Sequence, residues 1–145
     1  MVAFVNNDIL VIEDNSEMQE LLKMLLEEEG FNVLSVTSGG EAIDVLREDE
    51  PMLILLDLTL PDMKSDEFLL KVKNEKLANH VPILYFSALP RLDQLALPEG
   101  VVGVIQKPFQ INEFLEVLNS FKSGSTSLRI NLNNNNNGFN VNQVG

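Results

Sequence analysis

Residues 53–63 read LILLDLTLPDM, and this stretch decides the fold class. The apolar run Met52–Leu56 is followed at once by Asp57 and then by a loop that contains Pro61. An unbroken apolar run of this length is typical of a strand that is buried on both faces. A buried strand that ends in a carboxylate predicts a parallel sheet with polar groups gathered at the carboxyl ends of its strands.

Further apolar runs and helical patterns alternate on both sides of this stretch. The other predicted strands are Ile9–Ile12, Phe31–Val36, Val81–Phe86 and Val101–Ile105. Helices are predicted from Ser16, with Gln19 completing a capping box, around residues 42–46, from about Asp66, and after Pro108. A fourth helix at Arg91–Leu97 is expected to be short or irregular, because Pro90 precedes it and Pro98 and Gly100 follow it. This alternation predicts an α/β fold, a doubly wound sheet of five parallel strands.

Length and composition limit the classes of protein that remain. The 145 residues suffice for one domain, which we place at residues 1–122. Residues 123–145 are rich in Ser and Asn and are expected to be a disordered tail or a cloning remnant. A net charge of -12 argues against direct nucleic-acid binding. The absence of cysteine, of a signal peptide and of a long apolar segment favours a cytoplasmic protein without membrane insertion.

The residues that follow the predicted strands form the candidate site. They are Glu13, Asp14, Asp57, Ser87 and Lys107. Each alone has an ordinary explanation as a helix cap or a surface charge. Together, three carboxylates at one sheet edge would repel one another unless a cation neutralised them. Oxygen ligands without Cys or paired His point to Mg²⁺.

A carboxylate beside Mg²⁺, with an ammonium and a hydroxyl nearby, is also suited to attack a phosphoryl group. Asp57 is the candidate nucleophile. Lys107 and Ser87 are the groups that would stabilise the charge of the transferred phosphoryl oxygens.

Four motifs in this order resemble those of the bacterial response-regulator receiver domain. They are ILVIEDN at Ile9–Asn15, LILLDLTLPDM at Leu53–Met63, FSA at Phe86–Ala88 and KPF at Lys107–Phe109. The resemblance covers residues 8–122. It implies the flavodoxin-like strand order 2-1-3-4-5. It also implies a switch in two-component signalling that a sensor histidine kinase or a histidine phosphotransfer protein phosphorylates, with a downstream protein whose identity the sequence does not give.

The resemblance further implies a role for each site residue. Asp57 would be the phosphoacceptor, and the metal ligands would be Asp14, Asp57 and the backbone carbonyl of Thr59, with Glu13 acting through water. Lys107 would pair with a phosphoryl oxygen, and Ser87 would hydrogen-bond another, with backbone N–H groups of Thr59 and Ala88 assisting. The Lys107–Pro108 peptide bond would be cis.

Three departures from the family leave a second hypothesis open. Ser65 stands where receivers commonly have Gly, so a positive φ there would be strained. Val104 stands where they usually carry a Tyr or Phe that switches, and the fourth helix is expected to be short. The alternative is therefore a constitutive binding module of the same fold. A phosphatase with an Asp nucleophile is a third reading, but its expected second Asp is Thr59, so we expect a phosphoacceptor and not a turnover enzyme.

Overall fold

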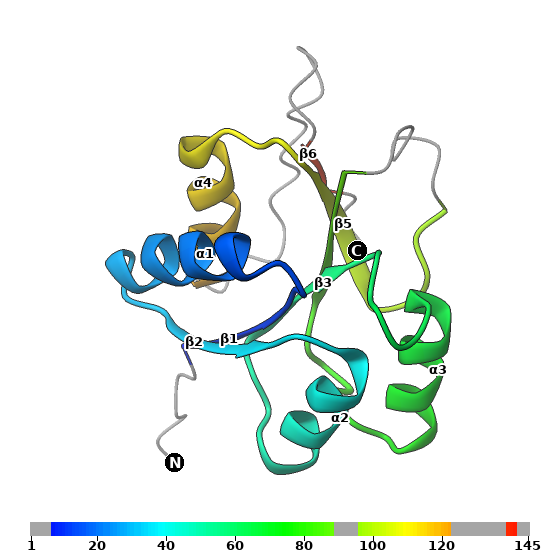
Figure 1. Ribbon diagram of the computed structural model, residues 1–145. Coiled ribbons are helices and arrows are strands. Elements are labelled where there is room, and N and C mark those ends of the chain that lie inside the picture. Colours follow the sequence, from blue (N-terminus) through cyan, green and yellow to red (C-terminus); the bar gives the residue numbers. More distant parts are fainter. Residues whose placement is uncertain (1–6, 89–95, 123–138, 142–145) are drawn as a thin grey trace.

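The computed structural model describes residues 7–88, 96–122 and 139–141 of the chain (Figure 1). The elements, in chain order, are β1 (Asp8–Ile12), α1 (Ser16–Glu28), β2 (Asn32–Val36), α2 (Gly39–Glu48), β3 (Leu53–Asp57), α3 (Ser65–Asn74), β4 (Ile83–Ser87), β5 (Val101–Gln106), α4 (Ile111–Lys122) and β6 (Phe139–Val141). The sheet order is β2-β1-β3-β4-β5-β6, and β1 to β5 are parallel. The predicted fold class and the order 2-1-3-4-5 are confirmed.

Two hydrophobic cores lie on opposite faces of the sheet. Figure 1 shows α1 and α4 covering one face and α2 and α3 covering the other. Neighbouring residues of a strand point to opposite faces, so Ile54 and Leu56 of β3 join the core under α2 and α3, while Leu53 and Leu55 join the core under α1 and α4. This double burial explains why the strands appear in the sequence as unbroken apolar runs.

The start of α1 differs from the predicted capping box. Asn15, and not Ser16, is the N-cap residue, and its side chain accepts a hydrogen bond from the Met18 backbone N–H at 2.9 Å. Gln19 donates instead to the backbone carbonyls of Glu13 at 2.7 Å and Val36 at 2.8 Å. Asn and Ser are similarly good N-caps, so the sequence does not distinguish between adjacent residues of these types. In the folded chain Gln19 ties the ends of β1 and β2 together.

The predicted fourth helix and the tail are only partly described. The helix expected at Arg91–Leu97 falls largely on residues outside the described ranges, and residues 96–98 form neither helix nor strand. The predicted helix after Pro108 is α4. In the segment expected to be a disordered tail, residues 139–141 form β6, which pairs antiparallel with β5. The rest of that segment lies outside the described residues.

The backbone geometry tests two predictions, the cis Lys107–Pro108 bond and the positive φ considered for Ser65. The Lys107–Pro108 bond is cis, as expected. Ser65 is the first residue of α3 and does not have a positive φ, so the strain considered for it is absent. Among the helices described, none has the length and apolar character that crossing a bilayer requires.

Candidate functional site

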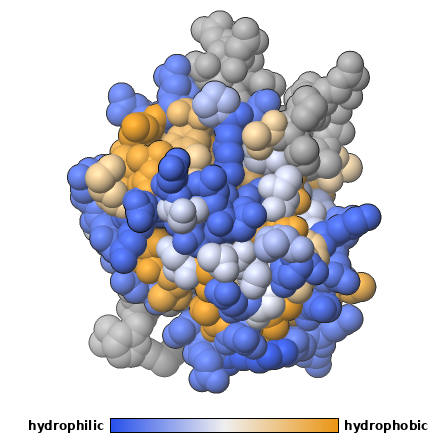
Figure 2. Space-filling model, in the orientation of Figure 1, coloured by the Kyte–Doolittle hydropathy of each residue, from blue (hydrophilic) through white to orange (hydrophobic). Residues whose placement is uncertain are grey.

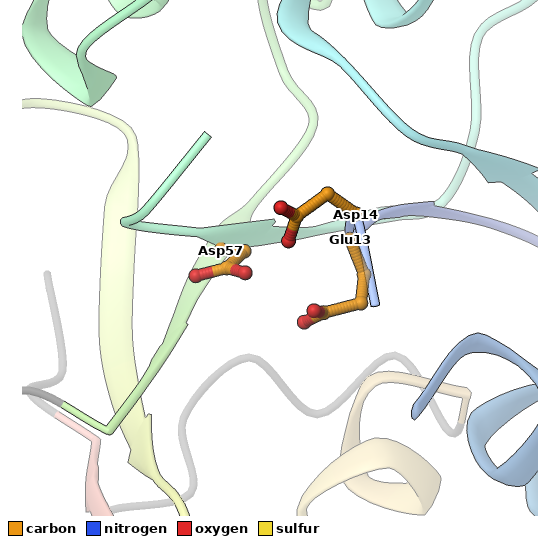
Figure 3. Close-up of side chains that lie close together, drawn as sticks. All are labelled: Glu13, Asp14 and Asp57. Atoms are coloured by element: carbon orange, nitrogen blue, oxygen red, sulfur yellow. The ribbon is translucent and has the colours of Figure 1, made fainter. Parts of the chain in front are cut away.

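Three carboxylates converge at the carboxyl ends of β1 and β3 (Figure 3). These strands are neighbours, with Ile12 paired to Leu56, so the residues that follow them meet at one edge. One carboxylate oxygen each from Glu13, Asp14 and Asp57 lies within 4.8 Å of the others. Glu13 and Asp57 are buried, and Asp14 is exposed. The predicted acidic cluster is therefore present, open to solvent on the Asp14 side.

Both oxygens of the buried Glu13 carboxylate have a hydrogen-bond partner. Oε1 accepts from the Asn15 backbone N–H at 3.1 Å, and Oε2 accepts from Lys107 Nζ at 2.7 Å. Burial raises the pKa of Glu13, the hydrogen bond from Lys107 opposes that rise, and the negative charge of Asp57 adds to it. Lys107 therefore offsets part of the cost of a negative charge on the buried Glu13 carboxylate.

Lys107 lies between the two buried carboxylates but is closer to Glu13. Its Nζ is 2.7 Å from Glu13 Oε2 and 3.8 Å from Asp57 Oδ2. The same Nζ lies over the Phe86 ring, 4.4 Å from the ring centroid, where the π-face attracts a cation. In this arrangement Lys107 pairs more closely with Glu13 than with Asp57.

Thr59 holds one oxygen of Asp57 with two donors. Its backbone N–H and its hydroxyl each donate to Asp57 Oδ1 at 2.9 Å. The other oxygen, Oδ2, faces Lys107. The two carboxylate oxygens of Asp57 are thus distinguished by their surroundings.

Ser87 ends β4 beside the strand that carries Lys107. Ser87 is buried, pairs in register with Gln106, and accepts a hydrogen bond at its backbone carbonyl from the Lys107 N–H at 2.8 Å. The five residues singled out from the sequence, Glu13, Asp14, Asp57, Ser87 and Lys107, therefore all follow or end strands at this one edge.

The comparisons with known proteins agree with this architecture. The family model of the response regulator receiver domain matches residues 9–119. The chain belongs to this family. The receiver is 29% identical over 119 residues to the polar-differentiation response regulator DivK of Brucella ovis, a match that covers 81% of this chain and 97% of DivK. The same identity and coverage are found for DivK of Brucella suis.

Solved structures show the same fold. The receiver domain of the Francisella response regulator 1452 matches with a TM-score of 0.72 and 23% identity, covering 83% of this chain and 99% of that one. The receiver domain of the sensor histidine kinase PA1611 from Pseudomonas aeruginosa matches with a TM-score of 0.71 and 24% identity, covering 81% and 98%. That structure has a magnesium ion coordinated in the active-site cleft. This chain is thus a receiver domain of two-component signalling.

The acidic cluster of this receiver suits a hard divalent cation. Three carboxylates face one ammonium, so the cluster carries an excess of negative charge even with Lys107 in place. Oxygen donors are the ligands that Mg²⁺ prefers, and an ion that keeps several waters would fit the exposed side at Asp14.

A fourth carboxylate near this edge was not recognised from the sequence. Asp62, in the loop after β3, accepts hydrogen bonds from the backbone N–H groups of Gly39 at 3.0 Å and Gly40 at 2.9 Å, at the start of α2. A Cβ on Gly39 would lie only 2.6 Å from Met63 Sδ, so the loop seats Met63 directly against the glycine. The motif PDM gave no signal for this, because its partner lies 23 residues earlier.

A buried tyrosine also has a role that the sequence did not indicate. Tyr85 is buried, and it pairs in register with Val104. Burial raises the pKa of Tyr85, and a hydrogen bond with the Ser65 side chain opposes the rise. The ring next to Val104 thus belongs to β4, and its hydroxyl contacts the first residue of α3.

Proposed function

We propose that this receiver accepts a phosphoryl group on Asp57 in a Mg²⁺-dependent reaction and thereby changes its affinity for a partner protein. The observation that carries the proposal is the buried Asp57 carboxylate, within 4.8 Å of the carboxylates of Glu13 and Asp14 and 3.8 Å from Lys107 Nζ. A nucleophile surrounded by metal-binding oxygens and one ammonium is suited to phosphoryl transfer.

The metal would be held by the carboxylates of Asp14 and Asp57 and the backbone carbonyl of Thr59, with Glu13 acting through water. When bound, it neutralises the acids and draws charge from the phosphoryl oxygens. Glu13 suits an indirect role, because both of its oxygens already accept hydrogen bonds from within the protein. Asp14 suits a direct role, because its carboxylate is exposed to solvent.

In the transfer step, a carboxylate oxygen of Asp57 forms a bond to phosphorus as the phosphorus–nitrogen bond of a phosphohistidine breaks. The leaving imidazole keeps the electron pair of that bond. Thr59 donates twice to Oδ1, so Oδ2 is the oxygen with the freer lone pairs, and we assign the attack to it. Lys107 Nζ, already 3.8 Å from Oδ2, then pairs with a phosphoryl oxygen.

Ser87 and two backbone groups complete the site after transfer. The Ser87 hydroxyl would hydrogen-bond a second phosphoryl oxygen, assisted by the N–H groups of Thr59 and Ala88. To reach the phosphoryl group, Lys107 must weaken its 2.7 Å contact with Glu13. This exchange of partners is the local event that would bias the two conformations of the switch.

The donor would be a sensor histidine kinase or a histidine phosphotransfer protein in the cytoplasm. Figure 2 shows apolar side chains gathered over α1 and α4, beside the hydrophilic centre of the same face. Ile111, at the start of α4, is 44% exposed, and Met18 and Leu115 are only partly buried. This patch offers an apolar surface to a donor helix, and the net charge of -12 argues against direct nucleic-acid binding. The downstream partner is a protein, and the receiver is an acceptor and not a turnover enzyme.

The test is the intact mass of the protein after incubation with acetyl phosphate, with and without Mg²⁺. We expect one phosphoryl adduct that requires Mg²⁺ and is absent from Asp57→Asn. Asp62→Asn is the matched control, because it removes a carboxylate near the same edge without entering the cluster. An adduct that persists in Asp57→Asn, or no adduct in folded wild-type protein, would contradict the proposal.

The second candidate function is a constitutive binding module. The buried Val104 favours it, since a valine cannot move a ring between buried and exposed positions as an aromatic residue can. Partner affinity that stays the same in phosphorylated and unphosphorylated protein would support this candidate, even if the adduct forms.

A further inference from the structure

The ring of Phe86 borders the acidic site. β4 lies between β3 and β5 in the sheet, and Phe86 pairs in register with Asp57 on one side and with Ile105 on the other. Side chains alternate between the two faces along each strand, so register partners in neighbouring strands lie on the same face. Phe86 and Ile105 both belong to the core under α1 and α4. Asp57, and Lys107 two residues after Ile105, therefore lie on the same face as the Phe86 ring.

Two further aromatic rings hold Phe86 in place. Phe86 is 1% exposed, and its ring centroid lies 5.4 Å from that of Phe109 and 6.4 Å from that of Phe114. The centroids of Phe109 and Phe114 are 4.7 Å apart, so the three rings form one cluster. Tilted aromatic pairs at such separations attract one another beyond the effect of the area that they bury. The cluster therefore restricts the orientation of the Phe86 ring at the site.

The ammonium group of Lys107 contacts two carboxylates and this ring. Nζ lies 2.7 Å from Glu13 Oε2, 3.8 Å from Asp57 Oδ2 and 4.4 Å from the centroid of the Phe86 ring. A hydrogen bond to a carboxylate requires a particular direction, whereas the face of an aromatic ring attracts a cation through its electron density. The ammonium can therefore exchange one oxygen acceptor for another without leaving the ring.

We propose that Phe86 is a positioning residue for phosphoryl transfer, whose ring keeps the Lys107 ammonium at the site as it exchanges Glu13 for the phosphoryl group on Asp57. This role rests on the proposed function and adds one residue to it. Lysine has a flexible four-carbon stem, and the Lys107 side chain is 18% exposed, so water competes for the ammonium once the Glu13 contact weakens. The ring opposes this loss, because it attracts the cation and excludes water from one side of it.

Packing alone would also explain a buried ring at residue 86, and the two roles differ in what they require of the side chain. Packing depends on the size and shape of the ring, whereas attraction for a cation depends on the electron density of its face. Fluorine atoms on the ring withdraw this density and change the volume of the side chain little. Fluorinated phenylalanines therefore separate a positioning role from a purely structural one.

A second measurement requires neither phosphorylation nor metal. Urea denaturation of Phe86→Leu, Lys107→Met and the double variant, all without Mg²⁺, measures the coupling between the two side chains. Leucine removes the aromatic face and remains apolar, while methionine removes the charge of Lys107 and remains unbranched. We expect Phe86→Leu to reduce the folding equilibrium constant by a factor roughly threefold larger with Lys107 present than in the Lys107→Met background. Additive changes would overturn the positioning contact.

The deciding test places phenylalanines with one, two or three ring fluorines at residue 86 of the full-length chain. The rate of adduct formation from acetyl phosphate at saturating Mg²⁺ should fall stepwise, to roughly a tenth of the wild-type rate with three fluorines. The same series at Phe68, buried in the core on the opposite face of the sheet, is the matched control and should leave the rate unchanged.

The outcomes separate the positioning role from the proposed function. A constant rate across the series at residue 86, or an equal fall in the series at Phe68, would overturn the positioning role while wild-type phosphorylation stands. Absence of the adduct from folded wild-type protein would overturn the proposed function and the positioning role with it.

Discussion

Carboxylates near the same sheet edge have opposite energetic effects in two regions of this receiver. In the cluster of Glu13, Asp14 and Asp57, negative charges lie within 4.8 Å of one another, and burial with the charge of Asp57 raises the pKa of Glu13. At the start of α2, burial would raise the pKa of Asp62, but the hydrogen bonds from Gly40 and Gly39 outweigh it, and the pKa is lowered.

The opposite pKa shifts of Glu13 and Asp62 indicate that one carboxylate group serves ligand binding and the other stabilises the fold. The charged form of Asp62 is favoured by the fold, because it caps N–H groups at the positive end of a helix. The charged form of Glu13 is disfavoured by burial and by the charge of Asp57, and a cation bound to the cluster would relieve this. Neutralising a carboxylate should therefore stabilise one region and destabilise the other.

The largest expected effect is that of Asp57→Asn, which removes one of the three negative charges of the acidic cluster. We expect complete loss of the phosphoryl adduct together with a gain of about 1 kcal/mol in the free energy of unfolding without metal, because one buried charge and its repulsion are removed. Urea denaturation measures the stability. A less stable Asp57→Asn protein would show that attraction to Lys107 outweighs the repulsion.

Lys107→Ala is expected to have the next largest effect. Glu13, at 1% exposure, would lose its only salt-bridge partner among the described residues, and breaking such a pair costs about 3 kcal/mol. Adding Glu13→Gln should recover much of the loss. A double-mutant cycle by urea denaturation measures this coupling, and additive losses would argue against it.

Magnesium should stabilise the wild type in proportion to its occupancy. At a concentration of one hundred times Kd, the free energy of unfolding should rise by about 2.7 kcal/mol, and chelation with EDTA should reverse the effect. Asp14→Asn should remove most of this response while Asp62→Asn retains it. Thermal unfolding with increasing Mg²⁺ provides the measurement, and an equal response of both variants would contradict the ligand assignment.

The smallest effect is expected at Asp62, where the test is whether a charged carboxylate stabilises the start of α2. Asp62→Ala should cost about 1 kcal/mol, because the N–H groups of Gly39 and Gly40 lose their acceptor while the N-cap residue Ser38 stays in place. The folded pKa of Asp62 is lowered, so its contribution is present above the unfolded pKa and is lost as the pH falls through the folded pKa. Stability measured from neutral to acidic pH should therefore differ between wild type and Asp62→Ala at neutral pH and converge in acid. A constant difference would rule out the charged cap.

The sequence predicted the framework well because burial on both faces imposes a simple pattern. Continuous apolar runs marked β1, β3 and β4, and the residues directly after them marked the acidic edge. Contacts between distant loops were not predictable in this way. The bonds from Gly39 to Asp62 and from Lys107 to Glu13 join residues 23 and 94 positions apart, and both depend on side-chain geometry.

Local features of a few residues were the other part of the structure that the sequence did not predict correctly. Asn15 and Ser16 are both good caps, and only the geometry at the end of β1 selects Asn15. β6 has three residues beside an asparagine-rich segment, too few to give a period-two pattern. Ser65 was considered for backbone strain, whereas its side chain contacts Tyr85.

The contact between Gly39 and Met63 limits how this receiver can vary. A Cβ at residue 39 would lie 2.6 Å from Met63 Sδ, whereas one at Gly40 would lie 3.4 Å from Asp62 Oδ2 and meet nothing closer. Adjacent glycines are therefore unequal as sites for substitution. In a library of variants selected for folding, residue 40 should accept alanine, while residue 39 should accept it only with a smaller or repositioned side chain at residue 63. The residues at positions 39 and 63 should therefore vary together, although α2 and β3 lie between them along the chain.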